Sequence, residues 1–309
     1  MSRLSQQASE IAYTSNTRVV RSNLSLYFEL TKPRLSLMTV ITAIVGYMLA
    51  DPTHSWPAIF GLIIGTTMAA GGAAALNQWW ERETDAMMVR TKGRPIPSGE
   101  LSPQAGLLFG LTLSFVGVIV LLYANNFLAA ALSFATIALY VLVYTPLKQI
   151  SSWNTAIGAI PGAIPPLIGW AAAVERIDVM GWVLFAILLL WQIPHFMAIA
   201  WTHRRDYADA GYRMVTTDEP TGFSAALQSL VCTALLFAVT LLPSFFGIAS
   251  WIFGGVAILS GAAFLFFAIQ FLIQSPRDQA ARYLFFTSIS YLPLILSALV
   301  LDVWLLAAK

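Results

Sequence analysis

Apolar runs of about 20 residues recur along the whole chain, and this is the length that an α-helix needs to cross the roughly 30 Å hydrocarbon core of a bilayer. Only 10% of the 309 residues are charged, whereas soluble domains carry roughly 25%. The sequence therefore predicts an all-α, polytopic membrane protein. We place its nine spans at about 34–50, 57–80, 104–124, 127–144, 154–174, 180–201, 225–246, 251–273 and 283–305.

The basic residues are distributed unevenly between the two sides of this arrangement. If nine spans are correct, 15 of the 17 Lys and Arg residues lie on one side, and only Arg176 and Lys309 lie on the other. Excess positive charge marks the cytoplasmic side of a membrane protein. We therefore expect an N-terminal tail, residues 1–30, in the cytoplasm, followed by one transmembrane domain over 31–309.

Other features of the chain limit its class. The first 30 residues show no short apolar core with a small-residue cleavage site, so we expect no signal peptide and place the protein in a bacterial cytoplasmic (inner) membrane. The single cysteine, Cys232, rules out an intrachain disulfide framework. A formal net charge of +2 gives no reason to expect a nucleic-acid partner.

The two longest internal connections, roughly 81–103 and 202–224, both face the basic side and hold eight of the 15 acidic residues. In the first, Asn77, Glu81 and Asp85 are spaced four apart, so a helix continuing through them would present all three on one face. Oxygen ligands in this position suit Mg²⁺, which prefers a few carboxylates together with phosphate oxygens and water.

Arg90 and Arg94 follow these oxygen donors and are also four residues apart. Guanidinium groups bind phosphate oxygens in a bidentate way, so the loop offers metal ligands followed by phosphate ligands. The alternative is a solvated helix end in which Glu81, Arg82, Asp85 and Arg90 pair with one another.

The second connection adds further acids and a histidine. His195 lies inside the sixth span, eleven residues before Asp206, and an ionisable residue within a span is a functional candidate. The alternative for His195 is a neutral imidazole bonded to a neighbouring helix. Asp209 offers another carboxylate. Lys148, just after the fourth span, lies on the same side and could hold a phosphate.

Several of these stretches resemble the UbiA-type intramembrane prenyltransferases. The residues that carry the resemblance are "TKPRLSLM" near the first span, "N-x-x-x-E-x-x-x-D-x-M-x-x-R-T-x-x-R-P" at 77–95, "YTPLK" at 144–148, "IGAIPGAIPPLIGW" at 157–170 and "HFMAIAWTHRRDYADAG" at 195–211. The first polar loop is most similar to the haem-modifying branch of the family. After the second motif this chain has "AGYRMVT", where the branch often has "AG-x-P-M-L-P".

The resemblance implies a cavity among nine helices, capped by the two polar loops, in which farnesyl diphosphate and haem b meet. It implies catalytic or Mg²⁺-binding roles for Asn77, Glu81, Asp85 and Asp206. Diphosphate binding would fall to Arg90, Arg94, Lys148 and Tyr207. His195 would contact the haem, a substrate rather than a cofactor, through its iron or its propionates.

The resemblance also suggests other residues and partners. Trp79, Trp80, Tyr140, Tyr144 and Tyr207 are candidates for the wall of the pocket, although aromatic residues also gather at membrane interfaces without a catalytic role. A haem A synthase acting downstream is a possible partner.

Two other functions fit the same sequence. One is a prenyltransferase for an aromatic quinone precursor or a chlorophyll-type acceptor, which would share the metal and diphosphate residues. The other is a transporter of an anionic metabolite, which predicts inverted repeats and a charged site near the bilayer midplane. The charges instead collect at one membrane face.

Overall fold

A computed structural model describes residues 21–51 and 55–307. Over these residues the chain is helical and contains no strand, and nine helices are long and apolar enough to span a membrane, which confirms the predicted class. The spans are Pro33–Ala50, Trp56–Trp80, Pro103–Ala124, Phe127–Ile150, Asn154–Val174, Val179–Thr202, Phe223–Phe245, Trp251–Ile273 and Asp278–Leu306.

Two predicted boundaries differ from the observed ones by five or six residues. The fourth span continues past Tyr144 because a π-helical turn, η1 (Leu139–Tyr144), leads into α8 (Thr145–Ile150), where Pro146 occupies the tolerated first turn. The ninth begins at Asp278 rather than near 283. Its polar first turn lowers the hydropathy, but an acidic residue favours a helix N-terminus.

The helices form two neighbouring groups. The first contains α3 (Pro33–Ala50), α4 (Trp56–Trp80), α6 (Pro103–Ala124), α7 (Phe127–Ala138) and α10 (Pro165–Val174). The second contains α11 (Val179–Thr202), α14 (Phe223–Phe245), α15 (Trp251–Ile273) and α16 (Asp278–Ala307). The helix α9 (Asn154–Ala163) contacts α11, and it is separated from α10 by a break at Ile164, immediately before Pro165.

Small residues allow some of these helices to approach closely. A Cβ on Gly46 of α3 would lie 2.0 Å from the carbonyl oxygen of Pro166, and one on Gly169 of α10 would lie 1.7 Å from that of Ala43. Neither position therefore tolerates a side chain without separating α3 from α10. Close backbone packing at small residues is typical of membrane helices.

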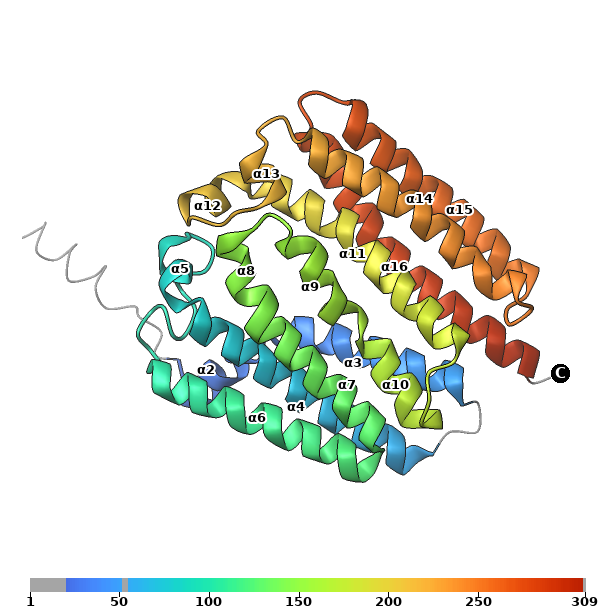
Figure 1. The fold of residues 1–309 in the computed structure, drawn as a ribbon, viewed down its shortest axis with the longest axis horizontal. Helices are drawn as coiled ribbons and strands as arrows, with labels where there is room; N and C mark the ends of the chain where they lie inside the picture. Colours follow the sequence, from blue (N-terminus) through green and yellow to red (C-terminus); the bar gives the residue numbers. More distant parts are fainter. Residues whose placement is uncertain (1–20, 52–54, 308–309) are drawn as a thin grey trace, which may run out of the picture.

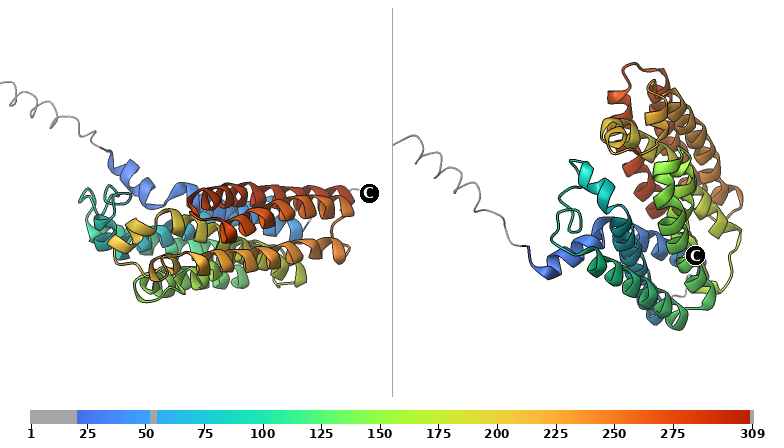
Figure 2. Two further views of the ribbon diagram at one scale, coloured as in Figure 1. Left: turned by 90° about the horizontal axis from the view of Figure 1, so that it is seen from above. Right: turned by 60° about the vertical axis from the view of Figure 1, so that its left-hand side comes forward.

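The short polar helices gather at one end of the bundle, which we call the polar end. Figure 1 shows α2 (Asn23–Leu30), α5 (Arg82–Met87), α8, α12 (Arg204–Asp209) and α13 (Val215–Asp218) there, with the C-terminus at the opposite end. In the side views of Figure 2 the long helices run roughly parallel to one another away from this end.

Part of the segment expected as a tail packs onto this end. The helix α2 begins after Ser22, whose hydroxyl accepts a hydrogen bond from the Ser25 amide at 3.3 Å. Its buried Leu26 and Leu30 pack with Ala75 of α4. The predicted tail residues 1–20 lie outside the described part of the chain.

Candidate functional site

The helix face predicted from the spacing of Asn77, Glu81 and Asp85 is formed. Although α4 ends at Trp80, the Glu81 amide donates to the Asn77 carbonyl at 2.9 Å and the Asp85 amide donates to the Glu81 carbonyl at 2.7 Å. The i to i−4 pattern therefore continues into α5, and the three side chains remain on one side. All three are buried, with relative exposures of 0, 4 and 1%.

Each of these three side chains accepts a hydrogen bond from a different basic side chain. Lys32 Nζ donates to Asn77 Oδ1 at 2.7 Å, Lys148 Nζ to Glu81 Oε1 at 2.7 Å, and Arg94 Nη1 to Asp85 Oδ2 at 2.5 Å. We call the set the polar cluster, and its members are Lys32, Asn77, Glu81, Asp85, Arg94 and Lys148.

The charges therefore do not pair as a simple solvated helix end would. Arg82 pairs instead with exposed Glu83 at 2.8 Å, outside the cluster. Glu81 pairs with Lys148 of α8, outside the first loop, whereas Asp85 pairs with Arg94 of the same loop. Within the described residues no ion pair joins two of the four residues of the alternative, and Glu81 and Asp85 are buried rather than solvated.

The backbone on either side of the polar cluster brings the ammonium groups of its two lysines into it. Lys32 precedes α3 with a φ of 46°, the left-handed region that costs a non-glycine residue energy. Lys148 extends from α8, one turn beyond η1, and its ammonium lies 4.7 Å from the centre of the Tyr144 ring. Thr145 completes the contact, because its hydroxyl accepts from Asn77 Nδ2 at 3.1 Å.

Burial and charge shift several pKa values here. The pKa of Lys32 falls to about 7, because burial disfavours the ammonium and Arg94 repels it. Burial opposes the charge of Glu81, but Lys148 and Lys32 hold the pKa of this carboxyl below its usual value. For Asp85 burial outweighs the attraction of Arg94, so its pKa is raised.

The oxygen donors of the cluster fit a hard divalent cation. Asn77, Glu81 and Asp85 supply one amide and two carboxylates, and Asp85 Oδ1 is buried without a hydrogen-bond partner among the described residues. Mg²⁺ takes one or two carboxylates and completes its shell with water and phosphate oxygens. The described residues hold no group of three His, Cys, Asp or Glu that could bind a metal unaided, so the fit requires oxygens from a ligand.

The second loop reaches the cluster through tyrosines and its backbone. Arg90 lies over the Tyr207 ring at 5.5 Å, and its Nη2 lies 3.4 Å from the Tyr207 hydroxyl. Tyr207 packs edge-on against buried Tyr212, whose ring lies 5.9 Å from the Lys148 ammonium. The predicted diphosphate-binding residues Arg90, Arg94, Lys148 and Tyr207 therefore lie around one region.

The two candidate aspartates of the second loop, Asp206 and Asp209, do not join them. Asp206 is half-buried, lies 3.7 Å from His203 Nδ1, and lines a different pocket of about 390 Å³ together with Asp278 of α16. Asp209 is exposed. A break at His203 between α11 and α12 places Asp206 away from the face of His195, with which the sequence had grouped it.

His195 lies at the interface of α11 and α16. Its Nδ1 is 2.8 Å from Ser288 Oγ, and its ring stacks with that of Trp191 and with that of Phe285. Bonding to a neighbouring helix was one of the two interpretations left open by the sequence, and it is observed. It does not exclude a ligand role, because it involves only one ring nitrogen.

The aromatic candidates have different surroundings. The rings of Tyr140 and Tyr144 contact each other in a tilted arrangement, with centres 5.4 Å apart, and Tyr144 lies beside Lys148. Trp79 packs against the cluster around α2, and Trp80 is 41% exposed at the surface. The structure therefore places Tyr140 and Tyr144, but not the two tryptophans, next to the polar cluster.

The sequence analysis missed Lys32 and Asn154 as parts of this region. Lys32 was counted only as a basic residue near the first span, although the motif "TKPR" contained it. Asn154 Nδ2 donates to the carbonyl oxygens of Ser151 and Arg213 at 2.8 and 2.6 Å, and the Arg213 amide donates to the Lys148 carbonyl at 2.8 Å. These bonds hold the second loop against α8.

Comparison with known families gives one matching model, described as the UbiA prenyltransferase family, over residues 39–289. Among curated proteins, a protoheme IX farnesyltransferase of Opitutus terrae is 48% identical over 93% of this chain and 98% of its own length. The protein of the same name from Solibacter usitatus is 41% identical over 89% of this chain and 98% of its own length.

Solved structures show the same fold at low sequence identity. A structure concerned with digeranylgeranylglyceryl phosphate synthase has a TM-score of 0.78 at 16% identity, covering 91% of this chain and 98% of its own. A UbiA homologue from Archaeoglobus fulgidus bound to GPP and Mg²⁺ has a TM-score of 0.64 at 14% identity, covering 89% and 99%.

Proposed function

Because the chain belongs to the UbiA prenyltransferase family, we propose that it transfers a farnesyl group from farnesyl diphosphate to the vinyl group of haem b, with addition of water, to give haem O. Family membership makes the chain an enzyme, and relatives that are 41 and 48% identical over about nine tenths of its length are named for this farnesyl transfer. These relatives favour haem over an aromatic quinone precursor as the acceptor.

The observation that carries the proposal is the convergence of Lys32, Arg94 and Lys148 on buried oxygens at the polar end of an otherwise apolar bundle. Such a site suits a ligand with a strongly anionic head and an apolar tail. The site lies at the ends of α4 and α8, away from the middle of the spans, which speaks against the transporter alternative.

The residues of the cluster would act on the head group. Asn77, Glu81 and Asp85 would hold Mg²⁺, with Asp206 as a further candidate, and the bound ion would neutralise charge on the leaving diphosphate. Arg90, Arg94, Lys148 and Lys32 would bind the diphosphate oxygens, and Tyr207 would hold Arg90 in place. Cationic donors that are preorganised in a dry site stabilise developing negative charge strongly.

The reaction then proceeds without a protein base that restores an aromatic ring. The bond between the allylic carbon and the diphosphate oxygen breaks with both electrons leaving on oxygen. The haem vinyl group attacks the allylic carbon, and water captures the resulting carbocation and loses a proton. The adjacent rings of Tyr140 and Tyr144 would exclude water from the allylic centre until the carbon–carbon bond has formed.

The orientation that we propose for the protein in the membrane follows from the distribution of its basic residues. Most of the Lys and Arg residues lie at the polar end, so we place that end in the cytoplasm of a bacterial cell, with the nine helices in its cytoplasmic membrane. Substrate exchange with a downstream haem A synthase would then take place within the bilayer.

The test is an acceptor comparison with purified protein. Farnesyl diphosphate and Mg²⁺ are supplied with haem b in one reaction and with 4-hydroxybenzoate in another, and products are identified by mass spectrometry. We expect haem that has gained farnesyl plus water in the first reaction and no prenylated product in the second. Product from 4-hydroxybenzoate alone would overturn the acceptor assignment.

A further inference from the structure

One arginine, Arg21, ties the segment before the first span to the first polar loop. Its Nη1 donates to Glu29 Oε2 at 2.6 Å, and its Nη2 donates to Glu100 Oε1 at 2.6 Å and to the Gly93 carbonyl at 2.9 Å. Glu29 lies in α2, whereas Gly93 and Glu100 lie 72 and 79 positions after the arginine. A single guanidinium therefore joins α2 to the loop that contains Arg94.

This arrangement differs from an isolated ion pair on the surface, which contributes little to stability. A guanidinium has several donors in one fixed plane, so a single ordered side chain can bind three acceptors. The Arg21 side chain is 30% exposed and the two carboxylates are 41 and 36% exposed, so water competes only in part. Because the third acceptor is a backbone carbonyl, Arg21 fixes a point of the loop backbone as well as two side chains.

Apolar packing holds α2 against the same loop. Leu26 and Leu30 of α2 are 3 and 0% exposed. They form one buried cluster with Ala75 of α4 and with Ile96 and Leu101 of the loop. The helix that follows Arg21 is therefore a fixed support, from which the guanidinium reaches the loop backbone.

The contact with Gly93 is the one that bears on the diphosphate site, because Gly93 directly precedes Arg94. Among the described residues, Arg21 is the only donor to the Gly93 oxygen. The Arg94 amide donates to the Thr91 carbonyl at 3.0 Å, and the Thr91 hydroxyl donates to the Asp85 carbonyl at 2.8 Å. The short stretch around Arg94 is therefore held from α5 at one point and from α2 at the other.

Ligand binding would change the partner of the Arg94 side chain. In the free protein Arg94 Nη1 donates to Asp85 Oδ2 at 2.5 Å, whereas the proposed function assigns Asp85 to Mg²⁺ and Arg94 to the diphosphate. Glycine allows more backbone conformations than any other residue, so an unanchored Gly93 would leave Arg94 without a fixed position once it leaves Asp85. The contact from Arg21 is to the backbone and does not depend on the partner of Arg94.

We propose that Arg21 is a positioning residue for diphosphate binding, which holds the Gly93 carbonyl from α2 and so keeps the Arg94 guanidinium within reach of the head group. This inference rests on the proposed function and gives the segment before the first span a role beyond that of a basic tail. Arg21 acts only through Arg94. Its contribution is preorganisation, because the ordering of Arg94 is then complete before the ligand binds.

The test is Arg21→Gln, which keeps a polar side chain but loses the charge and the planar fork. We expect roughly tenfold weaker binding of a non-hydrolysable farnesyl diphosphate analogue in calorimetry, a similar rise in the KM for farnesyl diphosphate, and a kcat within about twofold of the wild type. The kcat is retained because the bound head group itself orders Arg94. In the ligand-free protein, amide hydrogen exchange over residues 91–101 should become faster.

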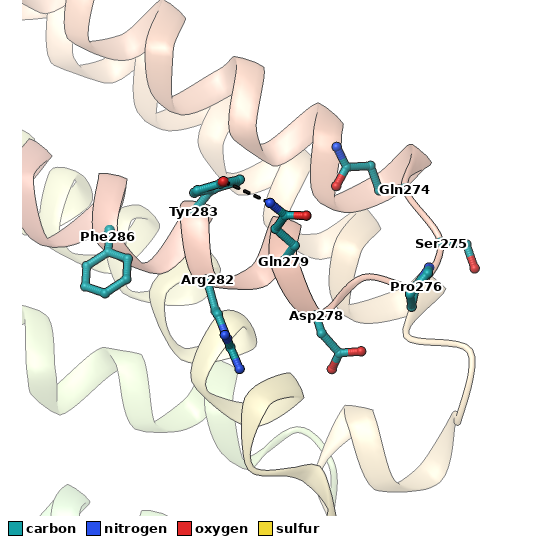
Figure 3. Close-up of a pocket in the computed structure, with 8 residues that line it drawn as sticks. All are labelled: Gln274, Ser275, Pro276, Asp278, Gln279, Arg282, Tyr283 and Phe286. Carbon is teal, nitrogen blue, oxygen red and sulfur yellow. Dashed lines mark hydrogen bonds between the residues drawn. The ribbon is translucent and has the colours of Figure 1, made fainter.

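Arg277→Gln is the matched control for loss of stability alone. Arg277 also donates three hydrogen bonds, to the carbonyl oxygens of Phe271, Leu272 and Thr221 at 3.1, 3.0 and 2.7 Å. Figure 3 shows its neighbour Asp278 at the start of α16, in the other group of helices. This change should lower the melting temperature but leave the affinity for the analogue and the hydrogen exchange of the first polar loop at their wild-type values.

A second variant tests the route through the backbone. Gly93→Ala restricts the backbone beside Arg94, and a Cβ at this position meets no atom within 4 Å. Added to Arg21→Gln, it should recover part of the lost affinity for the analogue, because it replaces part of the order that Arg21 supplied. A double variant that binds no more tightly than Arg21→Gln would show that the effect does not pass through Gly93.

The results separate this inference from the proposed function. If the wild type farnesylates haem b and Arg21→Gln binds the analogue as tightly as the wild type, the positioning role is wrong and the function stands. If Arg277→Gln weakens analogue binding as much as Arg21→Gln does, the effect comes from stability alone and the role is again wrong. If the wild type neither binds the analogue nor modifies haem b, both proposals fail.

Discussion

Lys148 Nζ lies 2.7 Å from Glu81 Oε1, although the two residues are 67 positions apart. Their side chains are only 19 and 5% exposed, so the pair is largely removed from water. A buried pair of this kind is costly to break, because the remaining partner becomes an uncompensated charge. The contact therefore ties α8 to the end of α4 and keeps both groups charged.

We predict that Lys148→Met lowers stability more than the double variant Glu81→Gln/Lys148→Met. The single change leaves the Glu81 carboxylate without its ammonium and should cost about 3 kcal/mol, whereas the double change removes both charges. Thermal unfolding of the detergent-solubilised protein measures the difference. Additive losses in the double variant would show that the pair contributes no coupling. Both variants should lose turnover.

Asp85→Asn should abolish the Mg²⁺ response. The change keeps the size of the side chain but removes the charge that a cation needs, so we expect turnover to fall at least a hundredfold with unchanged protein level and helicity. The matched control is Glu83→Gln, two residues away on the exposed side of α5. Activity close to the wild-type value in Asp85→Asn would refute the metal role.

Arg94→Lys should weaken diphosphate binding even though the charge is retained. Arg94 reaches Asp85 through Nη1, and a lysine offers one point charge in place of a planar fork with several donors. We expect roughly tenfold weaker binding of a non-hydrolysable farnesyl diphosphate analogue, measured by calorimetry. Lys92→Arg, in the same loop and exposed, is the control. Equal affinity in Arg94→Lys and the wild type would contradict the prediction.

The number of helices, and the part of the site that the first polar loop supplies, could be predicted from local sequence. Nine apolar runs predict nine spans, and spacing by four predicts that Asn77, Glu81 and Asp85 share a face, because both depend on neighbours along one helix. The charge asymmetry added the expectation that both polar loops lie at the same end.

Which side chains of the polar cluster contact one another could not be predicted, because these contacts join segments that are distant in the sequence. Nothing local to Lys32 indicates that a left-handed backbone turns its ammonium toward Asn77, 45 positions away. Asp206 was grouped with the first loop through the family resemblance, but after the break at His203 it lines a pocket together with Asp278. A helix interruption after an apolar run is decided by tertiary contacts that hydropathy does not record.

Gly169→Ala should destabilise the bundle. A Cβ at this position would lie 1.7 Å from the Ala43 carbonyl oxygen, so α3 and α10 would have to separate, at a cost of about 1–3 kcal/mol as for other overpacked sites. Gly255→Ala in α15, where a Cβ has no neighbour within 4 Å, is the control and should be neutral or slightly stabilising. Thermal unfolding in detergent compares the two. Equal melting temperatures would contradict the close crossing.

Diphosphate capture should weaken as the pH rises through about 7, the pKa of Lys32 in the folded protein. Above that pH the free enzyme loses the ammonium, so kcat/KM for farnesyl diphosphate should fall. Stability should change in the opposite direction. The unfolded chain holds this proton up to about 10.5, so folding is favoured as the pH rises between these values. Lys32→Arg stays charged and should lose the alkaline fall in kcat/KM. If the fall persists in Lys32→Arg, another group is responsible.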